Sequence, residues 1–283
     1  MADIFSVGVV GSGIMGAGLA EVSARAGYDV VLKSRTPEAA AQAVATITTA
    51  LDRQVAKGKL EADERQAILG RIQATADTSD LVECDLVIEN VIEALATKQA
   101  LFTELDAILK PSAVLATNTS TLSVTSLALS TRRPALVCGL HFFNPVAVMP
   151  LVEIVQPATT DGDTIARTTE FVQRLGKDPI VVADHAGFVV NALLFPYLNN
   201  AVRMLERGPA DRQSIDTAMR GGCGFPIGPL ALLDLVGLDT SLAILDTLHQ
   251  QFGDPNYEPA GTLRQLVAAG ELGRKTGSGF YRY

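Results

Sequence analysis

The sequence predicts an α/β protein in which a mostly parallel, doubly wound sheet is followed by an all-helical C-terminal part. Up to residue 183, short β-branched apolar runs alternate with stretches of helical periodicity, which is the pattern of a parallel sheet covered by helices on both faces. After Gly187 the periodicity is helical, and no convincing strand follows. Because 283 residues exceed one comfortable core, we predict two domains, 1–186 and 187–283.

The elements are expected in a regular order along the chain. A strand at 5–10, a helix at 14–26 and a strand at 29–32 form a βαβ opening. Pro37 suits the first turn of a long helix that reaches about residue 57, and a second helix at 62–71 completes an inserted helical hairpin. The remaining elements before the boundary are expected as strands at 85–89, 113–118, 135–142, 151–156 and 179–183, and as helices at 97–109 and 164–175.

Composition and charge exclude several classes of protein. The net charge of −8 argues against a nucleic-acid partner, which usually requires a basic face. No apolar run is long enough to span a bilayer, and no signal peptide is recognisable, so no membrane partner is expected. Three cysteines without CxxC or Cys/His spacing predict no metal site and reduced, mostly buried thiols in a cytoplasmic protein.

A glycine-rich turn lies at the end of the first predicted strand. Gly11-Ser12-Gly13-Ile14-Met15-Gly16 follows a strand and opens a helix, which is the context that a dinucleotide-binding G-x-G-x-x-G requires. We expect Gly11 to permit the tight turn, Gly13 to let the backbone approach a pyrophosphate, and Gly16 to allow close packing of the helix on the strand. Ile14 and Met15 begin the helix whose N–H groups would face the phosphates. The first domain is therefore predicted to be Rossmann-like, the alternative being a purely structural turn.

The residues at the end of the second strand bear on the choice of cofactor. An NAD site usually carries Asp or Glu there to bind the ribose 2′-hydroxyl, but the sequence reads Lys33-Ser34-Arg35-Thr36. Arg35 and Lys33 can neutralise a 2′-phosphate, and the hydroxyls can donate to it. We therefore favour NADP(H) as cofactor, with NAD(H) as the alternative if this is only a solvated basic loop.

Of the three histidines, His141 is the best candidate for acid/base chemistry. It lies where a predicted strand gives way to the turn Phe143-Asn144-Pro145, and open α/β folds place their ligands at such strand ends. His185, at the domain boundary, and His249, in a polar helical stretch, are expected to be structural or solvated.

Partners for His141 can be proposed from the surrounding pattern. Glu153 interrupts the apolar strand LVEIV, an unusual place for a carboxylate unless it faces a polar group such as an imidazole. Asn118 to Ser120 follow another strand end, and Asn191 comes early in the first helix after the domain boundary. The alternatives are that Glu153 is a surface residue on an edge strand and that Asn118 to Ser120 cap a helix.

These motifs together resemble short-chain 3-hydroxyacyl-CoA dehydrogenases, especially the bacterial 3-hydroxybutyryl-CoA dehydrogenases. The likeness covers nearly the whole chain. It rests on VGSGIMGAGLA at 10–20, DLVIENVIE at 85–93, NTSTLSVTSLA at 118–128, GLHFFNPVAVMPLVEIV at 139–155, GKDPIVVADHAGFVVNALL at 176–194, GFPIGPLALLDLVGLD at 224–239 and GRKTGSGFY at 273–281.

The resemblance implies a function and a role for each matching residue. The expected reaction interconverts (S)-3-hydroxyacyl-CoA, in particular 3-hydroxybutyryl-CoA, and the 3-oxoacyl-CoA with a nicotinamide cofactor. The C-terminal domain would complete the active site and form a homodimer. The implied catalytic residues are His141 as acid/base, Glu153 orienting it, and Ser120 and Asn191 bonding the reacting oxygen; Asn118, Glu93 and Lys98 would line the nicotinamide and ribose pocket, and Lys57 would contact the CoA nucleotide.

Family members commonly have an acidic residue at the position of Ser34, so this serine is the chief departure from the family pattern. The lack of an acidic residue agrees with the interpretation of Lys33 to Thr36 as a binding site for a 2′-phosphate. Two other functions stay open. A related dehydrogenase could act on a sugar acid or on a hydroxyacyl group bound to a carrier protein, although Lys57 and Lys59 favour a phosphate-bearing carrier such as CoA. A non-catalytic NADPH-binding protein is the second, and the presence of all four catalytic residues argues against it.

Overall fold

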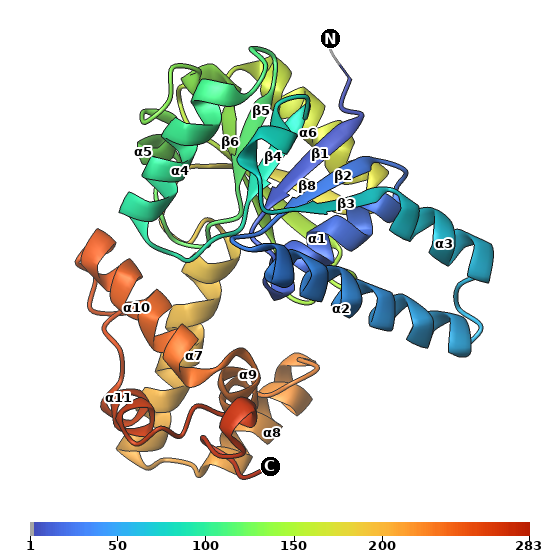
Figure 1. Ribbon diagram of the computed structural model, residues 1–283. Coiled ribbons are helices and arrows are strands. Elements are labelled where there is room, and N and C mark those ends of the chain that lie inside the picture. The colour runs from blue at the N-terminus through green and yellow to red at the C-terminus, as the bar shows by residue number, and fades with distance from the viewer. Residues whose placement is uncertain (1–2) are drawn as a thin grey trace. The chain divides into compact units, whose positions relative to one another are not determined.

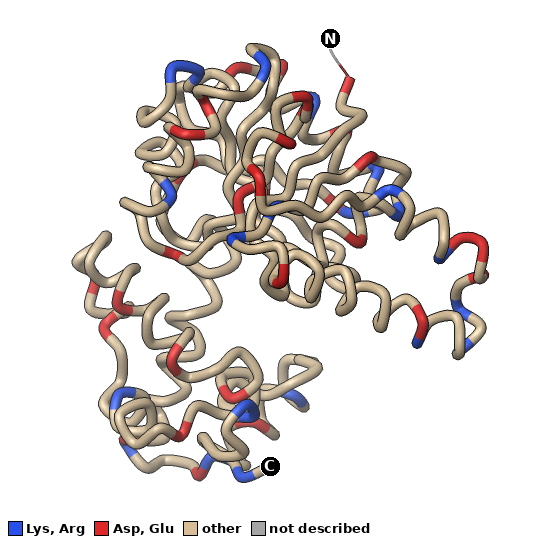
Figure 2. The backbone as a smooth tube through the Cα atoms, viewed as in Figure 1, with Lys and Arg blue, Asp and Glu red and all other residues tan. Residues whose placement is uncertain are grey.

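The computed structural model describes residues 3–283 and divides the chain into two compact units, the first ending at His185 and the second spanning Ala186–Tyr283 (Figure 1). Acidic and basic residues are interspersed along both units (Figure 2). Within residues 3–283 no helix combines the length and the apolar character needed to cross a membrane.

The first unit is built on one eight-stranded sheet in the order β3-β2-β1-β4-β5-β6-β7-β8. Every neighbouring pair is parallel except β6 with β7, which confirms the predicted mostly parallel sheet. The strands are β1 (Ser6–Val10), β2 (Asp29–Lys33), β3 (Ile72–Thr75), β4 (Leu86–Glu89), β5 (Val114–Thr117), β6 (Val137–Phe142), β7 (Leu151–Gln156) and β8 (Asp178–Ala183). The order reverses between β1 and β4, so a ligand-binding crevice is expected at their carboxyl ends.

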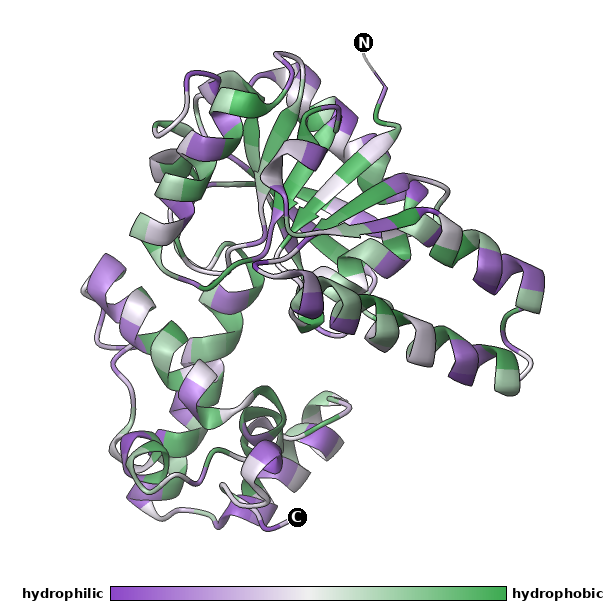
Figure 3. Cartoon of the chain, viewed as in Figure 1, coloured by the Kyte–Doolittle hydropathy of each residue, from purple (hydrophilic) through white to green (hydrophobic). Residues whose placement is uncertain are grey.

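Helices cover the sheet, and the predicted hairpin is present as α2 and α3. The helices of this unit are α1 (Ile14–Arg25), α2 (Pro37–Ala56), α3 (Ala62–Gly70), α4 (Leu95–Ile108), α5 (Val124–Ala128) and α6 (Gly162–Arg174). The hydroxyl of Thr36 accepts from Ala39 N and so caps α2, with Pro37 in its first turn. All residues of β4, β5 and β6 are buried, as expected for central parallel strands, and Figure 3 shows these strands as hydrophobic.

Three local features differ from the sequence prediction. The edge strand β3 and the helix α5 were not predicted, because four and five residues give too little periodicity to recognise. The strand predicted from residue 135 begins only at Val137, since a 3-10 turn at Pro134–Leu136 precedes it. Pro134 fixes its own backbone and lacks an N–H for the sheet, which favours a turn at this point.

The second unit consists of helices joined by loops, and within residues 186–283 it has isolated bridges near the C-terminus but no strand. Its helices are α7 (Val190–Arg207), α8 (Arg212–Cys223), α9 (Pro229–Val236), α10 (Leu238–Phe252) and α11 (Gly261–Ala268). Buried side chains from all five helices form a separate core, which includes Leu198, Leu233 and Leu245.

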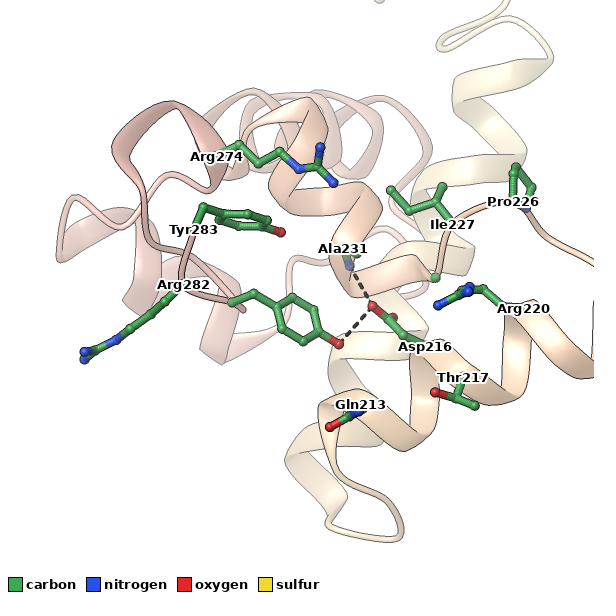
Figure 4. Close-up of a pocket in the computed structure, with 12 residues that line it drawn as sticks. Gln213, Asp216, Thr217, Arg220, Pro226, Ile227, Ala231, Arg274, Arg282 and Tyr283 are labelled. Carbon is green, nitrogen blue, oxygen red and sulfur yellow. Dashed lines mark hydrogen bonds between the residues drawn. The ribbon is translucent and has the colours of Figure 1, made fainter.

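Two buried carboxylates form hydrogen bonds that hold the C-terminal tail, residues 280–283, against the helices of this unit. Asp216 accepts from Leu230 N and Ala231 N at the start of α9 and from the Tyr281 hydroxyl at 2.9 Å (Figure 4). Asp234 accepts from the backbone of the tail at Phe280 and Tyr281. Burial, together with the Asp216 carboxylate, raises the pKa of Tyr281 and keeps it a hydrogen-bond donor. The tail therefore belongs to the folded unit.

Candidate active site

The centre of the site is a buried imidazole–carboxylate pair on neighbouring strands. The antiparallel register of β6 and β7 sets His141 directly opposite Glu153. His141 Nδ1 lies 2.7 Å from Glu153 Oε2, and the residues are 4% and 0% exposed. Because an ionised carboxylate can only accept, Nδ1 carries the proton and Nε2 of the neutral ring is left as an acceptor. The alternative of an exposed edge-strand carboxylate is wrong, since β7 lies between β6 and β8.

Ser120 faces the second nitrogen of the imidazole. Its Oγ lies 3.1 Å from His141 Nε2, which places a hydroxyl and a basic nitrogen at one point beside the ends of β5 and β6. The Phe143 ring packs against the imidazole with centroids 4.6 Å apart. The site therefore combines a proton acceptor of defined tautomer with a nearby hydrogen-bond donor.

Asn118 ties three strand ends together. Its Oδ1 accepts from Phe142 N at 2.7 Å, and its Nδ2 donates to Asn90 Oδ1 at 2.8 Å. The alternative role for residues 118–120 as a helix cap does not hold, because the cap of α5 is Ser123, whose hydroxyl accepts from Ser126 N. Asn118 instead fixes the ends of β4, β5 and β6 relative to one another.

A second buried network, centred on Glu89, was missed from the sequence. Glu89 is fully buried, and its carboxylate accepts from Lys98 Nζ at 2.7 and 2.9 Å and from the Thr117 hydroxyl at 2.8 Å. Lys98 is 1% exposed and also lies 3.4 Å from Glu93. Glu89 is a carboxylate at the end of the apolar run DLVIE. A carboxylate in an apolar strand was also the signal that pointed to Glu153, so Glu89 could have been predicted from the sequence.

Glu93 links this network to the turn that carries Ser120. Its Oε1 accepts from the hydroxyl of Thr119 and, at 2.9 Å, from Ser120 N. Glu93 and Lys98 were predicted to line the cofactor pocket from the family resemblance. In the structure both are engaged by protein groups, and the contacts of Glu93 hold the turn that carries Ser120.

The glycine turn has the geometry that a dinucleotide pyrophosphate requires. Gly11 has φ +110°, and a Cβ there would lie 2.6 Å from Asn90 O, so only glycine fits. A Cβ on Gly16 would lie 1.7 Å from Gly11 O. Gly13 has open space where a Cβ would be, and as N-cap of α1 it offers no side-chain cap to the first N–H groups. Ile14 is 79% exposed beside it. These residues fit a nicotinamide dinucleotide.

At the end of β2, Ser34 is buried and faces the glycine turn. Its Oγ lies 2.6 Å from Ser12 Oγ, whereas the neighbouring Arg35 is exposed. The serine hydroxyl therefore joins β2 to the glycine turn, and the guanidinium group stands on the surface.

The two remaining predicted substrate-binding residues lie at the ends of helices. Asn191 is the second residue of α7, belongs to the second unit and is buried. Lys57 is exposed at the C-terminal end of α2. His249 Nδ1 bonds to Asp254 O within the second unit, in keeping with a structural role. The first unit alone thus brings together His141, Glu153 and Ser120.

Comparison with known families decides the classification. Residues 6–185 match the model of the 3-hydroxyacyl-CoA dehydrogenase NAD binding domain, and residues 187–283 match that of its C-terminal domain. The chain belongs to the 3-hydroxyacyl-CoA dehydrogenase family. This confirms the resemblance drawn from the motifs and the predicted class, a nicotinamide-dependent dehydrogenase.

Individual members of the 3-hydroxyacyl-CoA dehydrogenase family are similar over their full length. The chain is 47% identical to a 3-hydroxybutyryl-CoA dehydrogenase of Mycobacterium tuberculosis, with 98% of each chain covered. It is 44% identical to a probable 3-hydroxybutyryl-CoA dehydrogenase of Deinococcus radiodurans, covering 98% of this chain and 99% of the relative. The crystal structure of (S)-3-hydroxybutyryl-CoA dehydrogenase PaaH1 from Ralstonia eutropha superimposes with a TM-score of 0.96 at 43% identity, covering 99% of both chains.

Substituting Glu89 tests the buried network of this family member. Glu89→Gln leaves the Lys98 ammonium buried without its main counter-charge, so we expect the free energy of unfolding to fall by about 3–5 kcal/mol. Chemical denaturation followed by circular dichroism measures this. Glu83→Gln is the matched control, because Glu83 is an exposed residue in the turn before β4. This substitution should change the free energy of unfolding little. Equal stability of the two variants would show that the Glu89–Lys98 pair is not a structural requirement.

Proposed function

We propose that this chain interconverts (S)-3-hydroxybutyryl-CoA and acetoacetyl-CoA with a nicotinamide cofactor. The observation that carries the proposal is the buried His141–Glu153 pair, in which His141 Nε2 lies 3.1 Å from Ser120 Oγ at the ends of β5 and β6. The names of the similar dehydrogenases support the choice of substrate.

The proton chemistry is assigned to His141. In the oxidative direction Nε2 accepts the proton of the substrate 3-hydroxyl, and in the reductive direction the imidazolium returns it. Glu153, 2.7 Å from Nδ1, fixes the ring and stabilises the positive charge that forms. A positioned acid/base of this kind contributes roughly 10²–10⁴-fold to the rate. The nicotinamide, when bound, exchanges a hydride with substrate C3.

Ser120 and Asn191 are assigned to the substrate oxygen. The backbone N–H of Ser120 donates to Glu93, and the Ser120 hydroxyl lies beside His141 Nε2. Because Ser120 is held in this way, its hydroxyl can donate to the alkoxide that develops on the substrate. The assignment of Asn191 rests on its place in the motif GFVVN. We further propose that residues 1–186 form the dinucleotide-binding domain and that residues 187–283 form the substrate and dimerisation domain of a homodimer. Lys57 is proposed to contact the CoA nucleotide.

Residues Gly11, Gly13, Ile14, Met15 and Gly16 would hold the cofactor, and we propose NADP(H) as its form. No carboxylate ends β2, where NAD sites usually carry one, and two cations, Lys33 and Arg35, lie there instead. Since the Ser34 hydroxyl already bonds to Ser12, binding of a 2′-phosphate would depend mainly on the Arg35 guanidinium group.

An assay with acetoacetyl-CoA tests the reaction directly. The wild-type chain should oxidise the reduced nicotinamide cofactor when acetoacetyl-CoA is added, which is followed spectrophotometrically. L-gulonate with the oxidised cofactor is the comparison substrate and should give no signal. Turnover of gulonate without turnover of acetoacetyl-CoA would replace the proposal by a sugar-acid dehydrogenase.

His141→Gln should lower kcat for acetoacetyl-CoA reduction by roughly 10²–10⁴-fold, because glutamine cannot transfer the proton. Binding of the reduced cofactor, measured by fluorescence titration, should be unchanged within error. His249→Gln, in the second unit, is the matched control and should retain activity. A His141→Gln variant with most of its activity intact would refute the assignment.

Cofactor preference has its own test. The ratio of kcat/KM for NADPH to that for NADH should favour NADPH in the wild type. Arg35→Asp should shift this ratio toward NADH by about tenfold or more, since one charge-assisted phosphate contact is replaced by repulsion. A clear wild-type preference for NADH would overturn the proposal of NADP(H) while leaving the proton chemistry intact.

A further inference from the structure

Asp184 lies near the end of the first unit, and its carboxylate binds a segment 59 to 61 residues earlier in the chain. It directly follows β8, and its Oδ2 accepts from the Ser123 hydroxyl at 3.1 Å, from Thr125 N at 2.7 Å and from the Thr125 hydroxyl at 2.6 Å. Its Oδ1 accepts from Val124 N at 3.1 Å. One side chain therefore holds three consecutive residues at the start of α5.

The carboxylate of Asp184 serves this segment alone. Within residues 3–283 no cation forms an ion pair with it, and all of its side-chain hydrogen bonds go to residues 123–125. Helix α5 has only five residues, which are too few for a helix to be stable without support. The N–H groups at the start of a helix favour a negatively charged partner. The position of α5 therefore depends on Asp184.

The turn that carries Ser120 lies directly before this segment and is held by a second carboxylate. Glu93 Oε1 accepts from Ser120 N at 2.9 Å and from Thr121 N at 3.3 Å. Only Leu122 lies between Thr121 and the first residue that Asp184 holds. The turn is therefore fixed at its beginning by Glu93 and at its end by Asp184.

The end of α5 that Asp184 binds also packs on the strand of His141. A Cβ placed on Gly139 of β6 would lie 3.2 Å from Val124 Cγ2, so the lack of a side chain at this position lets Val124 approach the strand closely. Gly139 and His141 are two residues apart on the strand, so they face the same side of the sheet. Asp184 accepts from Val124 N and thus holds α5 against the face of β6 that carries His141.

We propose that Asp184 is a positioning residue for the reaction and that it acts through Ser120. This inference rests on the proposed function, in which the Ser120 hydroxyl donates to the substrate oxygen. Ser120 Oγ lies 3.1 Å from His141 Nε2, and stabilisation of a developing alkoxide requires a donor that is already in place. Loss of the Asp184 bonds would release the end of the turn while Glu93 still holds its beginning. The hydroxyl would then occupy the productive position for a smaller fraction of the time.

The test compares two variants of the full-length protein with a matched control. Asp184→Asn removes the charge and one acceptor oxygen. Thr125→Val is the milder variant, since it keeps the size of the side chain and removes only one hydroxyl that donates to Asp184. Asp161→Asn is the control, because Asp161 also caps a helix of the first unit, accepting from Thr164 N at 2.7 Å. Its backbone N–H bonds to Ala135 O, ahead of β6 and away from the end that carries the imidazole.

Kinetics with acetoacetyl-CoA separate positioning from a purely structural role. We expect Asp184→Asn to lower kcat about tenfold and Thr125→Val about threefold, with both KM values unchanged within about twofold, because the Ser120 bond strengthens in the transition state. In the Ser120→Ala background, Asp184→Asn should lower kcat by no more than about twofold, since the group that it positions is already absent. A loss of about tenfold in that background would overturn the proposal. An Asp184→Asn enzyme as active as the Asp161→Asn control would overturn it as well.

An NMR measurement tests the positioning without turnover. The chain has three histidines, so the signals of the His141 imidazole are assigned as those that His141→Gln loses. Because the Ser120 hydroxyl faces Nε2, Ser120→Ala should shift the ¹⁵N signal of Nε2, and Asp184→Asn should shift it in the same direction. Asp161→Asn should leave this signal in place. An Asp184→Asn signal that matches the wild type overturns the positioning role. The expected shifts in a chain that is inactive on acetoacetyl-CoA support that role and contradict the proposed function.

Discussion

The antiparallel pairing of β6 with β7 is the constraint on which the site depends. Residues directly opposite one another in such a pair point to the same face, so His141 and Glu153 meet without any loop to position them. Both groups are buried, and the imidazole supplies a hydrogen-bond partner to a carboxylate that is 0% exposed. The one antiparallel pairing in an otherwise parallel sheet therefore positions the His141–Glu153 pair.

A second constraint holds the other partner of the imidazole. Ser120 stands on a turn after β5, and turns are less rigid than strands. Glu93 accepts from Ser120 N and from the Thr119 hydroxyl, and Lys98 ties Glu93 to the buried Glu89 on β4. The two networks converge on Ser120, one reaching its hydroxyl through His141 and the other its backbone through Glu93. Such support holds the Ser120 hydroxyl 3.1 Å from His141 Nε2.

The sequence alone was sufficient to predict seven of the eight strands, all except β3, together with the glycine turn. It also pointed to His141 and Glu153, because a polar residue in or at the end of an apolar strand is visible as a break in the pattern. Glu89 carried the same signal. Contacts between distant segments were not predictable in this way. Lys177 precedes β8 in sequence, and only the fold brings its ammonium to the carbonyls of Val146 and Met149.

The residues proposed to select the form of the cofactor and those proposed to transfer the proton lie on different strands. Ser34 is buried, and its hydroxyl is bonded to Ser12, so it belongs to the framework of the glycine turn. Arg35 is exposed and forms no hydrogen bond or ion pair with that framework within residues 3–283, so its charge can change without disturbing the turn. His141 and Glu153 are held by β6 and β7, on the other side of β4 and β5. We therefore expect that substituting Arg35 leaves the tautomer of His141 unchanged. Within residues 3–283 no hydrogen bond of Arg35 connects the end of β2 to the His141–Glu153 pair.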